Sequence, residues 1–173
     1  PVSAGAHGAA VLNDCKYVIS MNGNALELTL LRAGTCPEMC ADNRVHHFTY
    51  EFTTWEGSFA ESDVVRQGYE LNVKPVVAGG AVPTFSALTI DKENVILDTM
   101  KPAEDGSGDI ILRLYESKKA AVLATVTLSD LLQGEKVYLC DMLENCKEEI
   151  SVENGEISLN FRAFEVKTVR IKK

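Results

Sequence analysis

Two short apolar runs separated by a polar loop constrain the fold of this chain more than any other stretch of its sequence. The first run is Val95–Met100 (VILDTM), the second is Ile110–Glu116 (IILRLYE), and the loop KPAEDGSGD joins them. Both runs are rich in β-branched and bulky apolar residues and are too short for a typical helix. In the second run Ile110, Leu112 and Leu114 would share one face of a strand, opposite Arg113 and Tyr115. The stretch therefore predicts two β-strands joined by a loop too long for a tight turn.

Two Asn-Gly dipeptides predict hairpin turns elsewhere, because a type I′ turn needs positive φ at both central residues. The first, Asn22-Gly23, lies in an expected hairpin over residues 15–31 and predicts that these residues face each other: Ile19 and Leu26, Tyr17 and Leu28, Cys15 and Leu30. The second, Asn154-Gly155, predicts that Val152 faces Ile157 and that Ile150 faces Leu159. In both cases apolar residues meet on one face, so the turn and the alternating pattern agree on the register.

Short strands continue to the end of the chain at the spacing of a β-sandwich. Beyond the two runs already named, they are expected at 87–90, 120–128, 149–153, 156–161 and 166–171. Residues 1–10 are expected to be irregular, and a short helix is expected within 61–69 with Ser62 as its N-cap. The segment VKPVVAGGAVP combines prolines with paired glycines, which places a boundary near Gly79 and Gly80 and predicts domains over 1–80 and 81–173.

Composition excludes several classes of function. The chain has 173 residues, 46% of them hydrophobic, with a formal net charge of −8. This charge argues against nucleic-acid binding, which needs clustered Lys and Arg, and the sequence contains no apolar run that reaches the roughly 20 residues of a membrane span. Five cysteines are an odd number and do not indicate a disulfide scaffold. The sequence has no Asn-X-Ser/Thr acceptor, which favours a cytoplasmic protein, and the start at Pro1 suggests a piece of a longer one.

Three groups of side chains were considered as sites of chemistry. Thiols, imidazoles and a carboxylate gather in one segment as Cys36, Cys40, Asp42, His46 and His47, but their spacing matches no usual zinc site, so loop thiols and strand-entry histidines are favoured over a metal. The loop carboxylates Glu104, Asp105 and Asp109 could imitate a calcium site or a glycosidase pair, but a solvated hairpin tip is favoured. Trp55, near Tyr50 and Phe59, could stack on a sugar ring or simply pack in a core.

Four stretches together resemble the C-terminal region of glycoside hydrolase family 38, the zinc-dependent α-mannosidases. They are VILDTMKPAEDGSGDIILRLYE, KYVISMNGNALELTLLRAG, CPEMCADNRVHHFTYEF and FRAFEVKTVRI. The resemblance covers most of the chain, from about Gly8 to Ile171. Two residues depart from the family pattern. Ala163 stands where the family usually has a proline, and Asn43 stands where it usually has a glycine.

The resemblance implies an all-β chain, with residues up to about Val77 ending a β-supersandwich and the rest forming a small antiparallel Ig-like β-sandwich. It places the zinc ligands, the nucleophile and the acid/base carboxylate of a retaining α-mannosidase in a catalytic domain outside this chain. The chain itself would then hold no catalytic residue and no metal. Its partners would be the parent catalytic domain, which it would brace, and a mannose-containing oligosaccharide, with no nucleic acid and no membrane.

Arg32, at the end of the LLR segment, is the residue that the resemblance places near the substrate, and the alternative is a structural arginine paired with Asp42. A fragment cut from its parent would expose an apolar face and could self-associate. Two other functions stay open. The chain could be an independent carbohydrate-binding module with Trp55 as its platform, or a generic structural β-sandwich.

Overall fold

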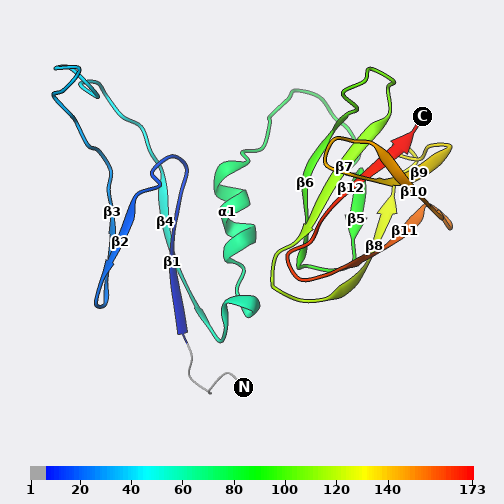
Figure 1. The fold of residues 1–173 in the computed structure, drawn as a ribbon, viewed down its shortest axis with the longest axis horizontal. Coiled ribbons are helices and arrows are strands. Elements are labelled where there is room, and N and C mark those ends of the chain that lie inside the picture. The colour runs from blue at the N-terminus through cyan, green and yellow to red at the C-terminus, as the bar shows by residue number, and fades with distance from the viewer. Residues whose placement is uncertain (1–6) are drawn as a thin grey trace. The chain divides into compact units, whose positions relative to one another are not determined.

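The computed structural model describes residues 7–173 and divides the chain into two compact units between Ala78 and Gly79 (Figure 1). Strands dominate both units, and every sheet is antiparallel. The all-β class expected from the sequence is therefore confirmed. The assignment of the first 80 residues to a supersandwich stays a prediction.

The C-terminal unit is a sandwich of two sheets. The larger sheet has the strand order β10-β9-β12-β7-β6, and the smaller has the order β11-β8-β5. The strands are β5 Leu88–Ile90, β6 Val95–Pro102, β7 Ile110–Glu116, β8 Val122–Leu128, β9 Lys136–Cys140, β10 Cys146–Ile150, β11 Glu156–Phe161 and β12 Val166–Lys172.

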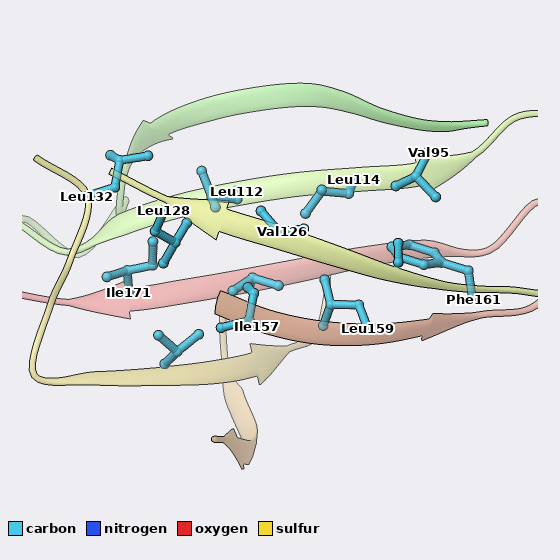
Figure 2. Close-up of a cluster of buried hydrophobic side chains, with 13 residues drawn as sticks. Val95, Leu112, Leu114, Val126, Leu128, Leu132, Ile157, Leu159, Phe161 and Ile171 are labelled. Carbon is cyan, nitrogen blue, oxygen red and sulfur yellow. The ribbon is translucent and has the colours of Figure 1, made fainter. Parts of the chain in front are cut away.

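The core of this unit lies between the two sheets, as Figure 2 shows. Alternate residues of each strand point into it, so Leu112 and Leu114 of the larger sheet meet Val126 and Ile157 of the smaller one. Phe161, which is fully buried, fills one end of the layer. Burying a side chain of this size contributes on the order of 1.5–3 kcal/mol to stability, and residues of this unit alone make up the core.

The second Asn-Gly turn forms where predicted, but the strands around it do not stay together. Asn154 and Gly155 take φ of 52° and 78°, and Glu153 exchanges two backbone hydrogen bonds with Glu156. Beyond that bridge β10 pairs with β9, and β11 pairs with β8 in the other sheet. The predicted facing of Ile150 and Leu159 is therefore wrong, because the turn carries the chain from one sheet to the other. Strand β9 lies outside the predicted set altogether.

The N-terminal unit contains two separate pairs of strands and one helix. Its elements are β1 His7–Asn13, β2 Ile19–Asn22, β3 Ala25–Leu28, β4 Tyr50–Glu56, the short 3-10 helix η1 Phe59–Glu61 and α1 Val64–Asn72. β1 pairs with β4, and β2 pairs with β3. The expectation of an irregular segment up to Ala10 is wrong from His7 onward, and its first six residues lie outside the described part of the chain.

The first hairpin turns one residue later than predicted. Asn22 pairs with Ala25, so Gly23 and Asn24 form the loop, and Ile19 faces Leu28 instead of Leu26. Gly23 has φ of 61°, and Asn24 is absent from the residues with positive φ. This combination fits a type II′ turn, which needs glycine only at its first central position. The shift moves the pairing by two residues, so the same side chains still share a face.

Helix α1 is amphipathic and short, and it starts at Val64 after Asp63. Ser62 is not its N-cap, because the Ser62 hydroxyl donates instead to the carbonyl of Phe59 at 2.7 Å. The helix lies against β1, and the Asn72 amide donates to the carbonyl of Asn13 at 3.3 Å. Within residues 7–173 no helix has both the length and the apolar character needed to cross a bilayer.

Candidate functional site

The N-terminal unit leaves its apolar side chains uncovered. Among residues 7–78 no hydrophobic side chain is buried, and Ser62 is the one residue of that range in the buried class. The largest uncovered side chains on its strands are here called the uncovered strand residues: Ile19, Met21, Leu26, Tyr50 and Phe52. Phe52 is 67% exposed and Met21 is 76% exposed. Large exposed apolar side chains of this kind mark an interaction site when they form a patch.

Strand alternation explains which of these side chains share a face. Tyr50 and Phe52 are two positions apart on β4 and share one face. Met21 and Leu26 face each other across the β2–β3 hairpin, so they also share a face. Each pair belongs to a sheet of only two strands, and such sheets are marginal in water without a further layer. The strands are therefore patterned for a partner surface that residues 7–78 do not themselves supply.

Trp55, the predicted sugar platform, is half-buried on β4. It lies opposite Gly8 of β1, and a Cβ at Gly8 would clash with the indole ring. Phe59 meets it edge-on, with ring centroids 6.1 Å apart. The indole Nε1 is buried and has no hydrogen-bond partner among the described residues. A hollow of about 630 Å³ adjoins the ring and is lined by His7, Gly8, Ala9, Thr54, Trp55 and Glu56.

Arg32 lies in the long segment between β3 and β4 and is exposed. The pairing with Asp42 considered as an alternative does not occur among the described residues. The backbone carbonyl of Asp42 instead lies 2.8 Å from Nε2 of His46. The structure therefore leaves the guanidinium of Arg32 directed to solvent in this chain.

The candidate metal ligands do not come together. No group of three His, Cys, Asp or Glu side chains within residues 7–173 is arranged to hold a metal ion. In the segment that carries the cluster, Cys36 and Cys40 are exposed thiols. The alternative of a zinc site at these residues is therefore not supported by the geometry.

The tip of the β6–β7 loop is exposed over residues 104–108, as expected, but Asp109 at its base is buried, and Asp105 and Asp109 form an ion cluster with Arg170 of β12. Nε of Arg170 donates to Asp109 at 2.6 Å, and its Nη2 donates to Asp105 at 2.6 Å and to Ser107 at 3.0 Å. The bonds to Asp105 and Asp109 raise the pKa of Arg170, and hydrogen bonding from Ser107, followed by that from Arg170, lowers the pKa of Asp105. Burial would raise the pKa of Asp109, but bonds from Arg170 and from the amide of Lys173 outweigh it and lower the pKa. Because Arg170 and the amides of Ser107 and Lys173 already occupy the oxygens of Asp105 and Asp109, these two carboxylates fit neither a calcium site nor a catalytic pair.

Glu116 is a second buried carboxylate that the sequence reasoning missed. It is fully buried and accepts hydrogen bonds from the Asn94 side chain at 2.9 Å and from the backbone amides of Lys118 at 2.7 Å and Phe164 at 2.9 Å. Burial would raise the pKa of Glu116, but these donors outweigh it and the pKa is lowered. The signal was present, because Glu116 continues the core-facing alternation of Leu112 and Leu114. A carboxylate at such a position indicates a satisfied polar group inside the fold.

Comparison with known protein families assigns the C-terminal unit. Residues 94–169 match the model described as the glycosyl hydrolases family 38 C-terminal beta sandwich domain. The C-terminal unit is a family 38 β-sandwich domain. The match includes β6 to β11, most of β12, Glu116 and the loop carboxylates Asp105 and Asp109, and it ends one residue before Arg170. In this family 38 domain, the Glu116 site and the Asp109–Arg170 pair each join a loop to a strand.

Curated relatives extend the likeness to the N-terminal unit. Alpha-mannosidase 2C1 of Mus musculus is 36% identical over 170 residues, which is 94% of this chain and 16% of that protein. Alpha-mannosidase 2C1 of Homo sapiens is 34% identical over 92% of this chain, again 16% of the relative. Alpha-mannosidase G of Dictyostelium discoideum is 33% identical over 94% of this chain and 16% of its own length. The chain with its family 38 domain thus spans about one sixth of the relatives that it matches.

Proposed function

We propose that this chain is the non-catalytic C-terminal β-region of an α-mannosidase that removes α-linked mannose from oligosaccharides, and that it braces the catalytic domain of that parent. The observation that carries the proposal is the contrast between the units. The family 38 domain has a complete core, whereas the strands of the N-terminal unit expose residues such as Met21 and Phe52. The relatives, which are α-mannosidases about six times as long, support the assignment of the parent.

Burial of the uncovered strand residues is the physical basis of the bracing role. Covering a large apolar side chain stabilises an interface by about 1.5–3 kcal/mol at most. Five such residues on two-stranded sheets would bind the parent's neighbouring layer firmly, even after the cost of ordering the interface. The catalytic domain would in turn complete the sheets of the N-terminal unit.

The hydrolytic chemistry would belong to the parent domain. The resemblance expects zinc and a carboxylate nucleophile there, in a retaining reaction with two displacement steps. Among the described residues, the buried carboxylates Asp109, Glu116 and Glu144 are all committed to structural hydrogen bonds or ion pairs. We place the parent in the cytoplasm, and the sequence supports this with no Asn-X-Ser/Thr acceptor.

Two experiments test the bracing role. The 173-residue chain is expected to show no turnover of an aryl α-mannoside, and measurable turnover would contradict the proposal. In the full-length parent, Phe52→Asp should lower both the melting temperature and the mannosidase activity, because a charge would enter a buried interface. Leu143→Asp is the matched control, since Leu143 is 83% exposed in the β9–β10 loop of the other unit. Equal activity and melting temperature in the two variants would refute the interface.

Arg32 is proposed to reach the edge of the parent's substrate pocket. Its exposure and its lack of a salt bridge with Asp42 leave the guanidinium available for a sugar hydroxyl. Arg32→Ala in the parent should raise KM for an oligosaccharide more than for a small aryl mannoside. Arg66→Ala, which removes an exposed arginine from α1, is the control. An unchanged KM for both substrates would remove Arg32 from the site.

A second candidate function is sugar binding at the hollow beside Trp55. The ring of Trp55 and the neighbouring Glu56 favour it, since both line the hollow and a ring face with a carboxylate beside it suits a sugar. Calorimetry of the chain with methyl α-mannoside tests it, with Trp55→Ala compared with Tyr17→Ala, which removes an aromatic that is 81% exposed elsewhere. Binding lost in Trp55→Ala and retained in Tyr17→Ala would support the module, and no binding by the unaltered chain would exclude it.

Self-association of the isolated chain is expected because the uncovered strand residues are exposed in it. Two copies could cover each other's uncovered strand residues at high concentration. Light scattering should show a mass that rises with concentration and falls back in Phe52→Asp. A constant monomer mass would contradict this expectation.

A further inference from the structure

Two cysteines face each other at one end of the larger sheet in the family 38 domain. Cys140 ends β9, Cys146 begins β10, and they are direct partners in the antiparallel register. Both are free thiols, and their Sγ atoms are 3.7 Å apart. β10 is the edge strand of the sheet, next to β9 (Figure 1). Directly opposed residues of antiparallel strands have Cα atoms about 4.5–5.5 Å apart, within the range of about 4.4–6.8 Å that a disulfide spans.

The loop between these cysteines is ordered by its own hydrogen bonds. The Asp141 carboxylate accepts from the backbone amides of Leu143 and Asn145, both at 3.0 Å, and pairs with Lys147 at 3.0 Å. The Asn145 side chain and Lys147 lower the pKa of Asp141 to about 2, so it stays ionised at neutral pH. Glu144 also pairs with Lys101 of β6 at 2.6 Å. The two thiols are therefore held opposite each other by a fixed loop.

We propose that Cys140 and Cys146 are a redox modification site, at which a peroxide oxidises the two thiols to a reversible intrachain disulfide that fastens β10 to β9. A disulfide bond is about 2.0 Å long. Rotation about the two Cα–Cβ bonds is enough to bring the sulfurs together, because the strands already hold them in register.

Burial decides the order of the chemical steps. Cys146 is exposed and Cys140 is buried, so the peroxide meets Cys146 first. Burial, followed by the Cys146 hydrogen bond, raises the pKa of Cys140 to about 12, which keeps it protonated at neutral pH. The Cys146 thiolate attacks one peroxide oxygen, breaks the O–O bond and becomes a sulfenic acid, and hydroxide leaves. The Cys140 sulfur then attacks the sulfenic sulfur. Its proton and the departing hydroxyl group leave as water, so two thiols and one peroxide yield one disulfide and two waters.

The remaining cysteines provide an internal comparison. Cys15, Cys36 and Cys40 are exposed free thiols in the N-terminal unit. The described structure gives none of them a sulfur partner like that of Cys140. Peroxide at low excess should therefore consume two thiols of the five and leave the other three open to alkylation.

Peptide mapping of the unaltered chain tests the site directly. After peroxide treatment and alkylation, cleavage after Lys136 and Lys147 by trypsin and after Glu144 by a glutamyl endopeptidase separates the two cysteines. A disulfide would leave VYLCDMLE joined to NCK, and a reductant would release both peptides. Finding Cys146 alkylated to the same extent as Cys36 after oxidation, or joined to another chain, would overturn the proposal.

Hydrogen exchange supplies a second readout on the intact chain. Amides of β10 should exchange more slowly after oxidation and return to their first rate on reduction, while those of β11 stay unchanged. Cys146→Ser should abolish this protection, and the matched variant Cys36→Ser should retain it. Protection that persists in Cys146→Ser, or that never appears in the unaltered chain, would contradict a bond between β9 and β10.

Discussion

The two units of this chain differ in whether their apolar side chains are buried or exposed. In the family 38 domain, alternate residues of both sheets close over a common layer that includes Leu112, Val126 and Phe161. In the N-terminal unit, strands with a similar alternating pattern carry Tyr50 and Phe52 on a face that nothing within residues 7–78 covers. Alternation alone thus shows which side chains share a face, but not whether the same unit supplies the opposing layer. That difference distinguishes an independent domain from part of a larger assembly.

Separating the units should have the largest effect. Residues 79–173 are expected to melt cooperatively and to give well-dispersed amide resonances, because they retain the whole core. Residues 1–78 are expected to lack a cooperative transition, because two-stranded sheets are marginal alone. Circular dichroism and heteronuclear NMR of the two pieces make the measurement. A cooperative melt of the N-terminal piece would break the comparison.

Truncating one phenylalanine in each unit should sharpen the comparison between the two units. Phe161→Ala removes a fully buried ring and should lower the free energy of unfolding of the family 38 domain by about 3–5 kcal/mol. Phe52→Ala removes a ring that is 67% exposed and should change the urea midpoint of the chain little. Similar losses in both variants would mean that Phe52 is buried in solution.

Disrupting the ion cluster of the family 38 domain should cause a smaller loss of stability. Asp109→Ala leaves the guanidinium of Arg170 buried with one partner fewer and should cost about 3 kcal/mol in urea denaturation. Asp105→Ala is the control, since its side chain is 53% exposed and water can replace it. If the two variants lose the same stability, the buried position of Asp109 is not what matters.

Lowering the pH should have the smallest of these effects on stability. Net hydrogen bonding lowers the pKa of Glu116 and of Asp109. Such carboxylates contribute stability that is present above their unfolded pKa of about 4 and is lost as the pH falls through the folded value. The urea midpoint of residues 79–173 should therefore fall below about pH 4, with a shallower slope in Glu116→Gln. An identical slope in that variant would exclude Glu116 as a source.

Local patterns predicted the strands that carry most of the core. Residues 110–116 and 156–161 were predicted with the bounds that β7 and β11 have. Two strands were missed. β1 (HGAAVLN) is rich in small residues, and β9 (KVYLC) is short, so neither shows a clear alternation. The β10–β11 turn was placed correctly, but whether its strands stay paired depends on which sheet each one joins, and that is not a local property.

The site residues were harder to predict because their partners are distant in the chain. Arg170 and Asp109 are 61 positions apart, so the sequence showed a crowded acidic loop but not the guanidinium that neutralises it. Trp55 was singled out as a possible sugar platform, and that stays a prediction, but only the pairing of β1 with β4 shows that Gly8 lies against its ring. The exposure of Phe52 likewise depends on which other elements of residues 7–78 pack against β4, and a single sequence does not show this.

During synthesis, the hydrogen bonds of Glu116 can be completed only after a late part of the domain has been made. Its carboxylate oxygens accept hydrogen bonds from Asn94, Lys118 and Phe164. Phe164 lies 48 positions after Glu116 in the chain. A ribosome delivers the first two donors early, but the carboxylate stays short of one donor until residue 164 has emerged. The nascent sandwich therefore cannot close that corner until nearly all of its residues have been translated, and a stalled or prematurely terminated product would carry an under-satisfied acid in its interior.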